Sequence, residues 1–409
     1  MQRRDILRGF AAGICGATQI AFAETSKAQP AQFRVAVIGH TGRGHYGHGL
    51  DVMWQKLEGV ELVAVADADA GGLQAATKLL GIKTGFADYR QMLTEQRPEI
   101  VAIAPRHVDQ HHEMLLAAIT AGARGIFIEK PFVRTPQEAD EVLSAAARAG
   151  VQIAVAHRNR CHPVLPVIRR LLEEGLIGRV LELRGRGKED PRGGSLDLWV
   201  LGSHVMNLAA YFGGAPRACS AGVYVGGEPA AGQHIQDGAE GLGLMAGDEV
   251  HARFELSSGV PFFFDSLKNA RLQKEASDRP ASFGLQIIGT KGIVDLRADQ
   301  HPFARVRLGS PLDPDPQPGA WQVISTAGVG QPEPLANLAG DLSGQLTGGR
   351  DLLQAVTEGR PPLCDGVQGL QTVEMICSVF ESHRLGGQRV TFPLKNRGNP
   401  WSLMSRKTR

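Results

Sequence analysis

Cysteine is scarce in this chain of 409 residues, which contains five, and neither sign of charge is in clear excess. The cysteines are scattered and form no C-x-x-C pair, so the sequence predicts neither a zinc knuckle nor a dense disulfide framework. Lys and Arg number 44 against 42 Asp and Glu. This balance gives no electrostatic reason to expect nucleic acid or an anionic membrane as a partner. No uncharged apolar run approaches the roughly 20 residues of a spanning helix, so no membrane span is expected.

The N-terminal segment, residues 1–29, has the three parts of an export signal followed by a short linker. Arg3 and Arg4 precede a mildly apolar stretch, residues 10–22, and Ala21-Phe22-Ala23 forms a small-x-small cleavage site. The paired arginines predict the twin-arginine route, which carries folded proteins to the periplasm or beyond. An amphipathic N-terminal helix is the alternative.

After this segment, apolar strands alternate with helices up to residue 156. Strands are expected at 33–38, 61–66, 84–86, 99–104, 125–128 and 151–156. The helices between them are expected at 44–57, 73–80, 88–93, 111–121 and 136–149. Such alternation indicates a parallel sheet covered on both faces, an α/β Rossmann domain over residues 30–156.

The pattern changes after residue 156, where longer alternating runs predict an open, mostly antiparallel sheet in an α+β domain. Its strands are expected at 180–186, 218–225, 250–256, 261–266, 284–288, 292–296 and 305–308. Helices are expected at 164–174, 196–212, 338–358 and 366–385, and residues 309–319 as an exposed loop. This second domain is assigned to residues 157–395, for substrate binding and oligomerisation, with residues 396–409 as a tail.

A glycine-rich loop, residues 39–44 (GHTGRG), lies between the first strand and the expected helix, where a Rossmann phosphate loop belongs. Gly39 is expected to make the tight turn and Gly44 to allow close packing of helix on sheet. The middle position, normally glycine, holds Thr41 with Gly42 beside it, which departs from the usual pattern. A literal G-x-G-x-x-G at residues 42–47 is a second register, but it begins away from the strand end.

Asp67 ends the second strand, where an acid accepts hydrogen bonds from the adenosine ribose and repels a 2′-phosphate. The sequence therefore predicts NAD as the cofactor, with NADP as the alternative if Arg43 meets its phosphate. Capping of the next helix is the simpler explanation for Asp67.

Glu129-Lys130-Pro131 follows the fifth strand, at the edge of the sheet where open α/β folds bind ligands. With this element the chain resembles the Gfo/Idh/MocA oxidoreductase family over residues 33–394. Further matching pieces are Val37-Ile38-Gly39, Ala66-Asp67, His111, residues 158–163, Gly202-Ser203-His204, residues 287–292 and residues 358–362. The resemblance implies a nicotinamide cofactor between the two domains, a sugar-like substrate and an often cis Lys-Pro peptide that aims Lys130 at the nicotinamide.

The resemblance also implies a catalytic pair, an Asp and a His four residues apart on one helix. His204 matches the histidine and is predicted to take the hydroxyl proton, while the Lys130 ammonium polarises the oxygen. The acid position holds Val200, which cannot orient an imidazole. Asp197, about two helical turns before His204, is predicted to serve through substrate or water, or to cap the helix.

Other polar residues are expected along the same cleft. The cofactor is expected to meet, besides the glycine loop and Lys130, four residues: Pro105, Arg106, His111 and Glu129. The substrate is expected to meet Arg158, Arg160, His162 and Arg192, with ordinary surface charge as the alternative. His107 and His111 have a spacing that can bind metal on a helix, but no third ligand is apparent and no metal is predicted.

The leading hypothesis is an exported oxidoreductase for a sugar or polyol, acting as a homodimer or homotetramer through its C-terminal sheet. A free nicotinamide pool is not expected outside the cytoplasm, so export implies a tightly bound cofactor. The alternatives are a redox-neutral NAD-dependent glycosidase or epimerase that oxidises one carbon transiently, and a non-catalytic sugar-binding protein.

Overall fold

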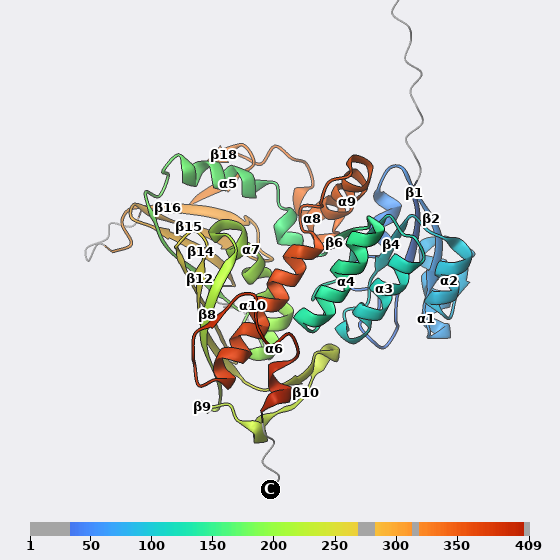
Figure 1. The fold of residues 1–409 in the computed structure, drawn as a ribbon. Coiled ribbons are helices and arrows are strands. Elements are labelled where there is room, and N and C mark those ends of the chain that lie inside the picture. Colours follow the sequence, from blue (N-terminus) through green and yellow to red (C-terminus); the bar gives the residue numbers. More distant parts are fainter. Residues whose placement is uncertain (1–32, 269–282, 313–318, 405–409) are drawn as a thin grey trace, which may run out of the picture. The chain divides into compact units, whose positions relative to one another are not determined.

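The computed structural model describes residues 33–268, 283–312 and 319–404 (Figure 1). The expected export signal and linker, residues 1–29, lie outside these ranges, as do residues 313–318 of the expected exposed loop and the last residues of the expected tail. The described chain contains no helix long and apolar enough to cross a membrane.

The first sheet, formed within residues 33–155, has six parallel strands in the order β3-β2-β1-β4-β5-β6, which is the Rossmann arrangement. Its strands are β1 Phe33–Ile38, β2 Val60–Ala66, β3 Gly85–Phe86, β4 Ile100–Ile103, β5 Gly125–Ile128 and β6 Gln152–Val155. Because all six run in the same direction, the residues that follow them gather at one carboxyl edge.

Helices cover both faces of this sheet because neighbouring strand residues point to opposite sides. Ala36 and Ile38 pack with α2 (Tyr89–Gln96), α3 (His111–Thr120) and α4 (Pro136–Ala149), whereas Val35 and Val37 pack with α1 (Ala70–Leu80). The expected caps of α4 are present: the Thr135 side chain accepts from the Glu138 amide, and Gly150 is left-handed.

The helix expected after the glycine loop does not form, which corrects the sequence-based prediction. Residues 41–51 make successive turns, and only a short 3₁₀ helix, η1 (Val52–Lys56), follows. Gly44, His45, Gly47 and Gly49 have positive φ angles of 90°, 53°, 61° and 82°. Left-handed residues in such close succession cannot continue a right-handed helix.

A helix from the C-terminal part of the chain helps to cover this face instead. The segment expected as one helix at 338–358 is two, α8 (Leu338–Ser343) and α9 (Leu346–Glu358), separated at Gly344 and Gln345. Helix α9 packs against η1, β5 and β6. A Cβ on Gly349 would lie 2.3 Å from the Met53 methyl group, so a larger residue there would require the Met53 side chain to shift.

The second sheet is mixed and mostly antiparallel. In the described C-terminal residues its main path is β18-β17-β16-β15-β14-β7-β13-β12-β8-β19, and only β13 and β7 pair in parallel. The strands are β7 Val180–Arg186, β8 Pro216–Val225, β12 Glu249–Leu256, β13 Pro261–Leu267, β14 Gly284–Gly289, β15 Gly292–Arg297, β16 Ala304–Leu308, β17 Gln322–Ser325, β18 Gly328–Val329 and β19 Val390–Thr391. A short strand, β9 (Glu228–Pro229), pairs with β8.

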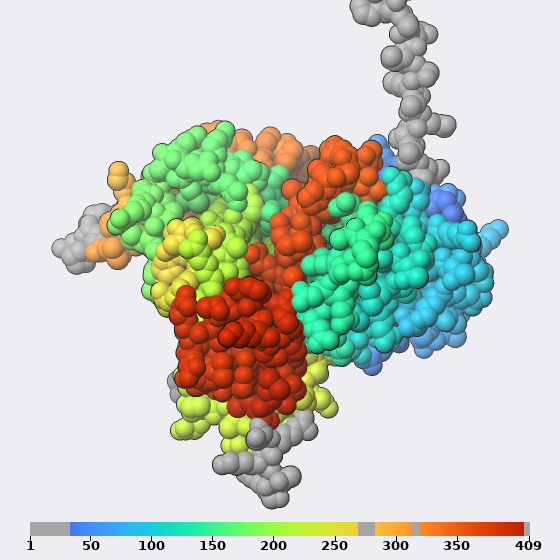
Figure 2. Space-filling view, viewed as in Figure 1, coloured from blue at the N-terminus to red at the C-terminus, as the bar shows by residue number. Residues whose placement is uncertain are grey.

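Helices link the two sheets. The long helix α10 (Gly366–Arg384) contacts α4, β6 and β8, and Arg397 forms an ion pair with Asp140 of α4. Figure 2 shows the C-terminal residues, in red, lying against the green segment that contains α4. Further short or separate helices of this part are η3 (Arg158–Cys161), α5 (Val164–Glu173), η5 (Gly232–His234), η6 (Ala239–Gly241) and η7 (Pro400–Leu403).

The helix expected at 196–212 is continuous but irregular. It begins as α6 (Ser195–Asp197), widens into a π-helical turn over Leu198–Gly202, and ends as α7 (Ser203–Gly213). Such π turns inside helices are frequent at functional sites. A separate hairpin, β10 (Gln236–Gly238) and β11 (Gly243–Met245), carries at its tip Gly241, beside Asp109 of the first domain.

Candidate active site

The glycine loop is fixed by close approaches that exclude side chains. The Gly39 amide donates to the Ala66 carbonyl at 2.9 Å, and a Cβ on Gly39 would lie 2.1 Å from the Tyr46 ring. A Cβ on Gly44 would lie 2.4 Å from the Arg106 amide nitrogen. Gly39 thus occupies the expected turn, whereas Gly44 is pressed against the backbone after β4, since no helix follows it.

Asp67 accepts hydrogen bonds from this loop and from two residues outside it, Tyr46 and Asp69. Its carboxylate receives the Thr41 amide at 3.0 Å, the Thr41 hydroxyl at 2.7 Å, the Tyr46 hydroxyl at 2.9 Å and the Asp69 amide at 3.0 Å. Burial raises the pKa of Asp67, but the hydrogen bonds from Thr41, Asp69 and Tyr46 together outweigh burial. The net pKa is lowered, so the carboxylate is ionised at neutral pH. Thr41, in the place of the usual glycine, therefore orients Asp67.

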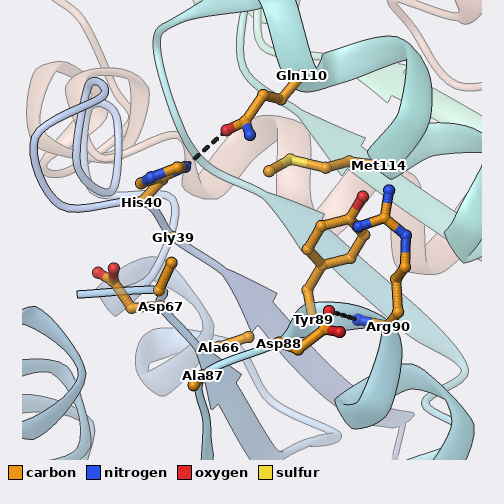
Figure 3. Close-up of a pocket in the computed structure, with 11 residues that line it drawn as sticks. Gly39, His40, Ala66, Asp67, Ala87, Asp88, Tyr89, Arg90, Gln110 and Met114 are labelled. Carbon is orange, nitrogen blue, oxygen red and sulfur yellow. Dashed lines mark hydrogen bonds between the residues drawn. The ribbon is translucent and has the colours of Figure 1, made fainter. Parts of the chain in front are cut away.

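A pocket of about 220 Å³ opens beside Asp67 at the carboxyl edge of the first sheet (Figure 3). It is lined by Gly39, His40, Ala66, Asp67, Ala68, Ala87, Asp88, Tyr89, Arg90, Gln110 and Met114. His40 and Gln110 close one side through a 2.6 Å hydrogen bond. The sequence analysis missed the lining residues from α2 and α3, because only the fold brings these helices beside the glycine loop.

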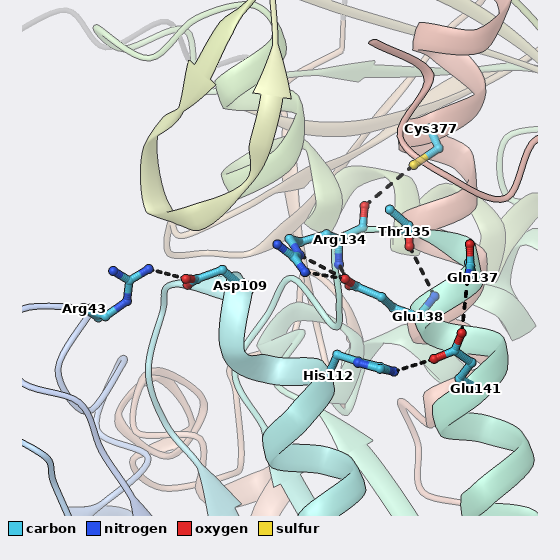
Figure 4. A network of polar contacts seen from close by, with 9 residues as sticks. All are labelled: Arg43, Asp109, His112, Arg134, Thr135, Gln137, Glu138, Glu141 and Cys377. Carbon is cyan, nitrogen blue, oxygen red and sulfur yellow. Dashed lines mark hydrogen bonds and ion pairs between the residues drawn. The ribbon is translucent and has the colours of Figure 1, made fainter. Parts of the chain in front are cut away.

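Arg43 does not line this pocket; it pairs with Asp109 in η2 (Val108–Gln110), as Figure 4 shows. The same view shows α4 held at its start by Thr135 and Glu138, and joined to α3 by the His112–Glu141 ion pair at 2.9 Å. The alternative of an NADP phosphate on Arg43 thus competes with an existing ion pair.

His111 and Glu129 follow β4 and β5 with both side chains fully buried, and their expected contacts with a cofactor stay a prediction. His111 is fully buried, and its ring nitrogens face the carbonyls of Pro105 at 2.8 Å and Pro131 at 2.9 Å. Glu129 is also fully buried and binds the Lys130 amide and His48. Burial raises the pKa of Glu129, but the His48 hydrogen bond and the charges of His48 and Lys130 together outweigh burial, so the net pKa is lowered.

Lys130 crosses from the first domain to the helix that carries His204. The Lys130–Pro131 peptide is cis, as the resemblance implied, and the Lys130 Nζ donates to the Val200 carbonyl at 2.6 Å. His204 follows on the same helix, and burial lowers its pKa, with the Lys130 charge adding to the effect. Two residues far apart in sequence therefore belong to one polar cluster, at the position where the usual acid is replaced by Val200.

The cluster has a third member that the sequence analysis did not single out. His157 follows β6, and its Nδ1 lies 3.4 Å from Nδ1 of His204. Burial lowers the pKa of His157 to about 3 and that of His204 well below its usual value, with the Lys130 charge acting in the same direction. Its position directly after a parallel strand, like those of Asp67 and Glu129, was the available signal.

Asp197 makes its hydrogen bonds to residues outside this cluster, and its expected role through substrate or water stays a prediction. It is fully buried and accepts from the Ser266 hydroxyl at 2.6 Å and the Glu189 amide at 3.1 Å. Burial raises its pKa. Asp197 therefore anchors the start of the helix to β13 and to the segment after β7.

The four expected substrate residues separate into different environments. Arg158 pairs with Asp299, and with His162 it lines a pocket of about 90 Å³ next to the β15–β16 connection. His162 stacks on Phe303 with ring centroids 4.5 Å apart. Arg160 instead lies over the Tyr211 ring at 4.2 Å, and Arg192 pairs with Asp190, although its charge still acts on Lys130.

His107 and His111 do not meet as ligands, because His107 precedes η2 while both nitrogens of His111 face carbonyls. No group of three or more His, Cys, Asp or Glu side chains within the described ranges is arranged to hold a metal ion.

Known proteins resemble this chain over most of its length. Levoglucosan dehydrogenase of Pseudarthrobacter phenanthrenivorans is 25% identical over 345 residues, which cover 74% of this chain and 83% of that enzyme. D-apiose dehydrogenase of Paraburkholderia graminis is 32% identical over 162 residues, but this match spans only 40% of the chain and 41% of the enzyme. The apo structure of levoglucosan dehydrogenase superposes with a TM-score of 0.67 at 21% identity, covering 89% of this chain and 99% of that one, which shows the shared fold.

Two family models match consecutive parts of the chain. Residues 33–157 match "Oxidoreductase family, NAD-binding Rossmann fold", and residues 169–392 match "Oxidoreductase family, C-terminal alpha/beta domain". These matches confirm the predicted fold class, the oxidoreductase class and the NAD type of cofactor. With its Rossmann sheet, its glycine loop and its cis Lys-Pro element, the chain belongs to the Gfo/Idh/MocA family of oxidoreductases.

Proposed function

We propose that this protein oxidises a secondary alcohol of a sugar, polyol or related carbohydrate, with NAD as the hydride acceptor. The observation that carries the proposal is the cluster of Lys130, His157 and His204, which joins the carboxyl edge of the Rossmann sheet to a helix of the second domain. The levoglucosan and D-apiose dehydrogenases among its relatives support a carbohydrate substrate.

The nucleotide end of the site fits NAD. The ionised Asp67 and the pocket of about 220 Å³ beside it suit an adenosine with a free 2′-hydroxyl, because a carboxylate would repel a 2′-phosphate. Gly42 is exposed with open space around its Cα, so the loop offers backbone next to the pyrophosphate. No α-helix follows the described loop directly, so no helix dipole attracts the pyrophosphate there. The attraction must come instead from the backbone amides of the loop.

At the other end, the chain's own groups manage a proton. When bound, the nicotinamide supplies the hydride acceptor. His204, whose lowered pKa keeps its imidazole neutral at neutral pH, takes the hydroxyl proton, and Lys130 stabilises the charge that develops on the substrate oxygen. Arg158 and His162 line the neighbouring pocket, where they bind further hydroxyl groups.

The test is NADH formation by the purified full chain with free carbohydrates and polyols, levoglucosan, inositol and D-apiose included. We expect turnover with at least one of these alcohols and none with NADP. Hydrolysis of a glycoside without net NADH would favour the redox-neutral alternative. That alternative gains weight from Arg3 and Arg4, since an exported enzyme needs a cofactor that is regenerated in place.

Export and assembly belong to the same proposal. We expect the twin-arginine route to carry the folded protein to the periplasm, and replacing Arg3 and Arg4 by Lys to leave it in the cytoplasm. We expect the open face of the second sheet, which exposes Arg184, Arg253 and His251, to form a homodimer or homotetramer. Light scattering of the purified protein measures that state.

A further inference from the structure

His157 and His204 meet through the same kind of atom, Nδ1, at 3.4 Å. Their rings are perpendicular, with centroids 5.2 Å apart, and the two residues are only 2% and 5% exposed. The two histidines come from different elements: His157 lies two residues after β6, directly before η3, and His204 belongs to α7. The contact therefore exists only because the two domains are packed together.

Such a contact needs one proton between the two nitrogens. A neutral imidazole carries one donor and one acceptor, so one ring must donate its Nδ1–H and the other must offer a lone pair at Nδ1. If His204 accepts, its own proton sits on Nε2 and the ring cannot take a proton there. If His204 donates, its Nε2 keeps a lone pair. Only the second arrangement leaves Nε2 of His204 free to act as a base.

Burial, and after it the surrounding charges, keep this pair neutral. The charges of Lys130 after β5, of Arg158 in η3 and of His48 after the glycine loop all oppose a positive charge on the His204 ring. His157 faces Lys130 and the opposing charge of Glu129. A carboxylate would do the opposite, but position 200 is Val200, and the nearest acid on the helix, Asp197, is bound to Ser266.

We propose that His157 takes the place of the missing acid, accepting the Nδ1–H of His204 and so holding His204 in the tautomer that acts as a base. This inference rests on the proposed function. As the O–H bond of the substrate breaks, a new N–H bond forms at Nε2 of His204, while the C–H bond yields its hydride to the bound NAD. The Nδ1 proton is then shared with His157, and the surplus proton leaves to water with the product. His157 is thus a positioning residue.

The variant that separates this role from mere packing is His157→Phe, compared with His157→Asn. Phenylalanine fills the space without an acceptor, whereas the Asn carbonyl can still accept the proton. We expect His157→Phe to lower kcat by roughly ten- to hundredfold, a part of the 10²–10⁴-fold worth of a general base, with KM and NAD affinity little changed. We expect His157→Asn to recover part of that loss. His383→Phe is the matched control, because His383 is a partly buried histidine that hydrogen-bonds to Ala230 and Val223 and packs against Trp401.

A second readout does not depend on turnover. Nitrogen NMR of the full chain with ¹⁵N-labelled histidine reports which ring nitrogen carries the proton. We expect His204 protonated at Nδ1 in the native protein and a shift toward the Nε2 tautomer in His157→Phe. An Nε2–H tautomer of His204 in the native protein, or a His157→Phe variant with unchanged kcat and pH profile, would overturn the proposal. If the native protein oxidises no alcohol, the proposed function fails, and the NMR result alone decides the histidine pairing.

Discussion

The nucleotide end and the catalytic end of the candidate site bury their key groups, Asp67 and His204, to a similar degree. Asp67 stays charged, whereas His204 stays neutral. Asp67 is 1% exposed and is surrounded by donors, which hold its pKa down and its charge in place. His204 is 5% exposed and faces Lys130 and Arg158, so burial and these charges together hold its pKa well below the usual value. Burial alone thus sets neither state, and the neighbours decide whether a buried group stays charged.

The largest effect is expected at the neutral end, from removing the base or its charged neighbour. His204→Ala and Lys130→Ala should each lower kcat by roughly 10²–10⁴-fold, because both act on one proton transfer. The double variant should lose less than the product of the two factors, since residues that act as a unit are not additive. Steady-state kinetics and a parallel NAD titration measure this. A His204→Ala variant with full turnover would place the chemistry elsewhere.

The charged end can be tested through cofactor affinity. Asp67→Ala removes a charged carboxylate, and a hydrogen bond to a charged group is worth about 1.5–3 kcal/mol. We expect NAD affinity to fall by roughly ten- to hundredfold and the preference against NADP to weaken. Asp67→Asn keeps an acceptor for Thr41 and should lose less. Calorimetric titrations with both cofactors measure it, and unchanged affinity for both would contradict the assignment of Asp67.

A third change tests how the charged end is built. Gly39→Ala places a methyl group 2.1 Å from the Tyr46 ring, which donates to Asp67, so the loop must shift. Overpacking of this kind costs about 1–3 kcal/mol of unfolding free energy. Gly71→Ala in α1 is the matched control, because its closest neighbour lies at 3.3 Å and alanine favours helices. Chemical denaturation compares the two, and equal stabilities would show that the Tyr46 contact is loose.

The last effect is gradual and concerns stability as a function of pH. The folded-state pKa of His157 is lowered to about 3, whereas an unfolded histidine titrates near 6.5. Between these values the unfolded chain binds more protons, so stability should fall as pH drops from about 6.5 toward 3, by at most about 1.4 kcal/mol per pH unit from this residue. Denaturation midpoints measured across this range should flatten in His157→Phe. A slope that persists would assign the effect to other groups.

Much of the local structure was readable from the sequence because strand and helix periodicity is a local property. The strands of the first sheet, the strand β7 and the helix α10 lie close to their expected ranges. The prediction of a helix after β1 was wrong, because residues in left-handed conformation, His45 among them, leave no periodic pattern in the sequence. The break at Gln345 was missed for the same reason, since an apolar pattern continues on both sides of it.

The sequence by itself determined which residues end the parallel strands, and with them Asp67, Lys130 and the family of the fold. It determined this because strand ends and glycine turns are encoded within a few neighbouring residues. Only the tertiary structure decided that His157 faces His204, that Asp197 turns to Ser266, and that α9 covers the first sheet. These contacts join residues far apart along the chain, and no spacing rule specifies which distant side chains share a buried space or which charge each meets there.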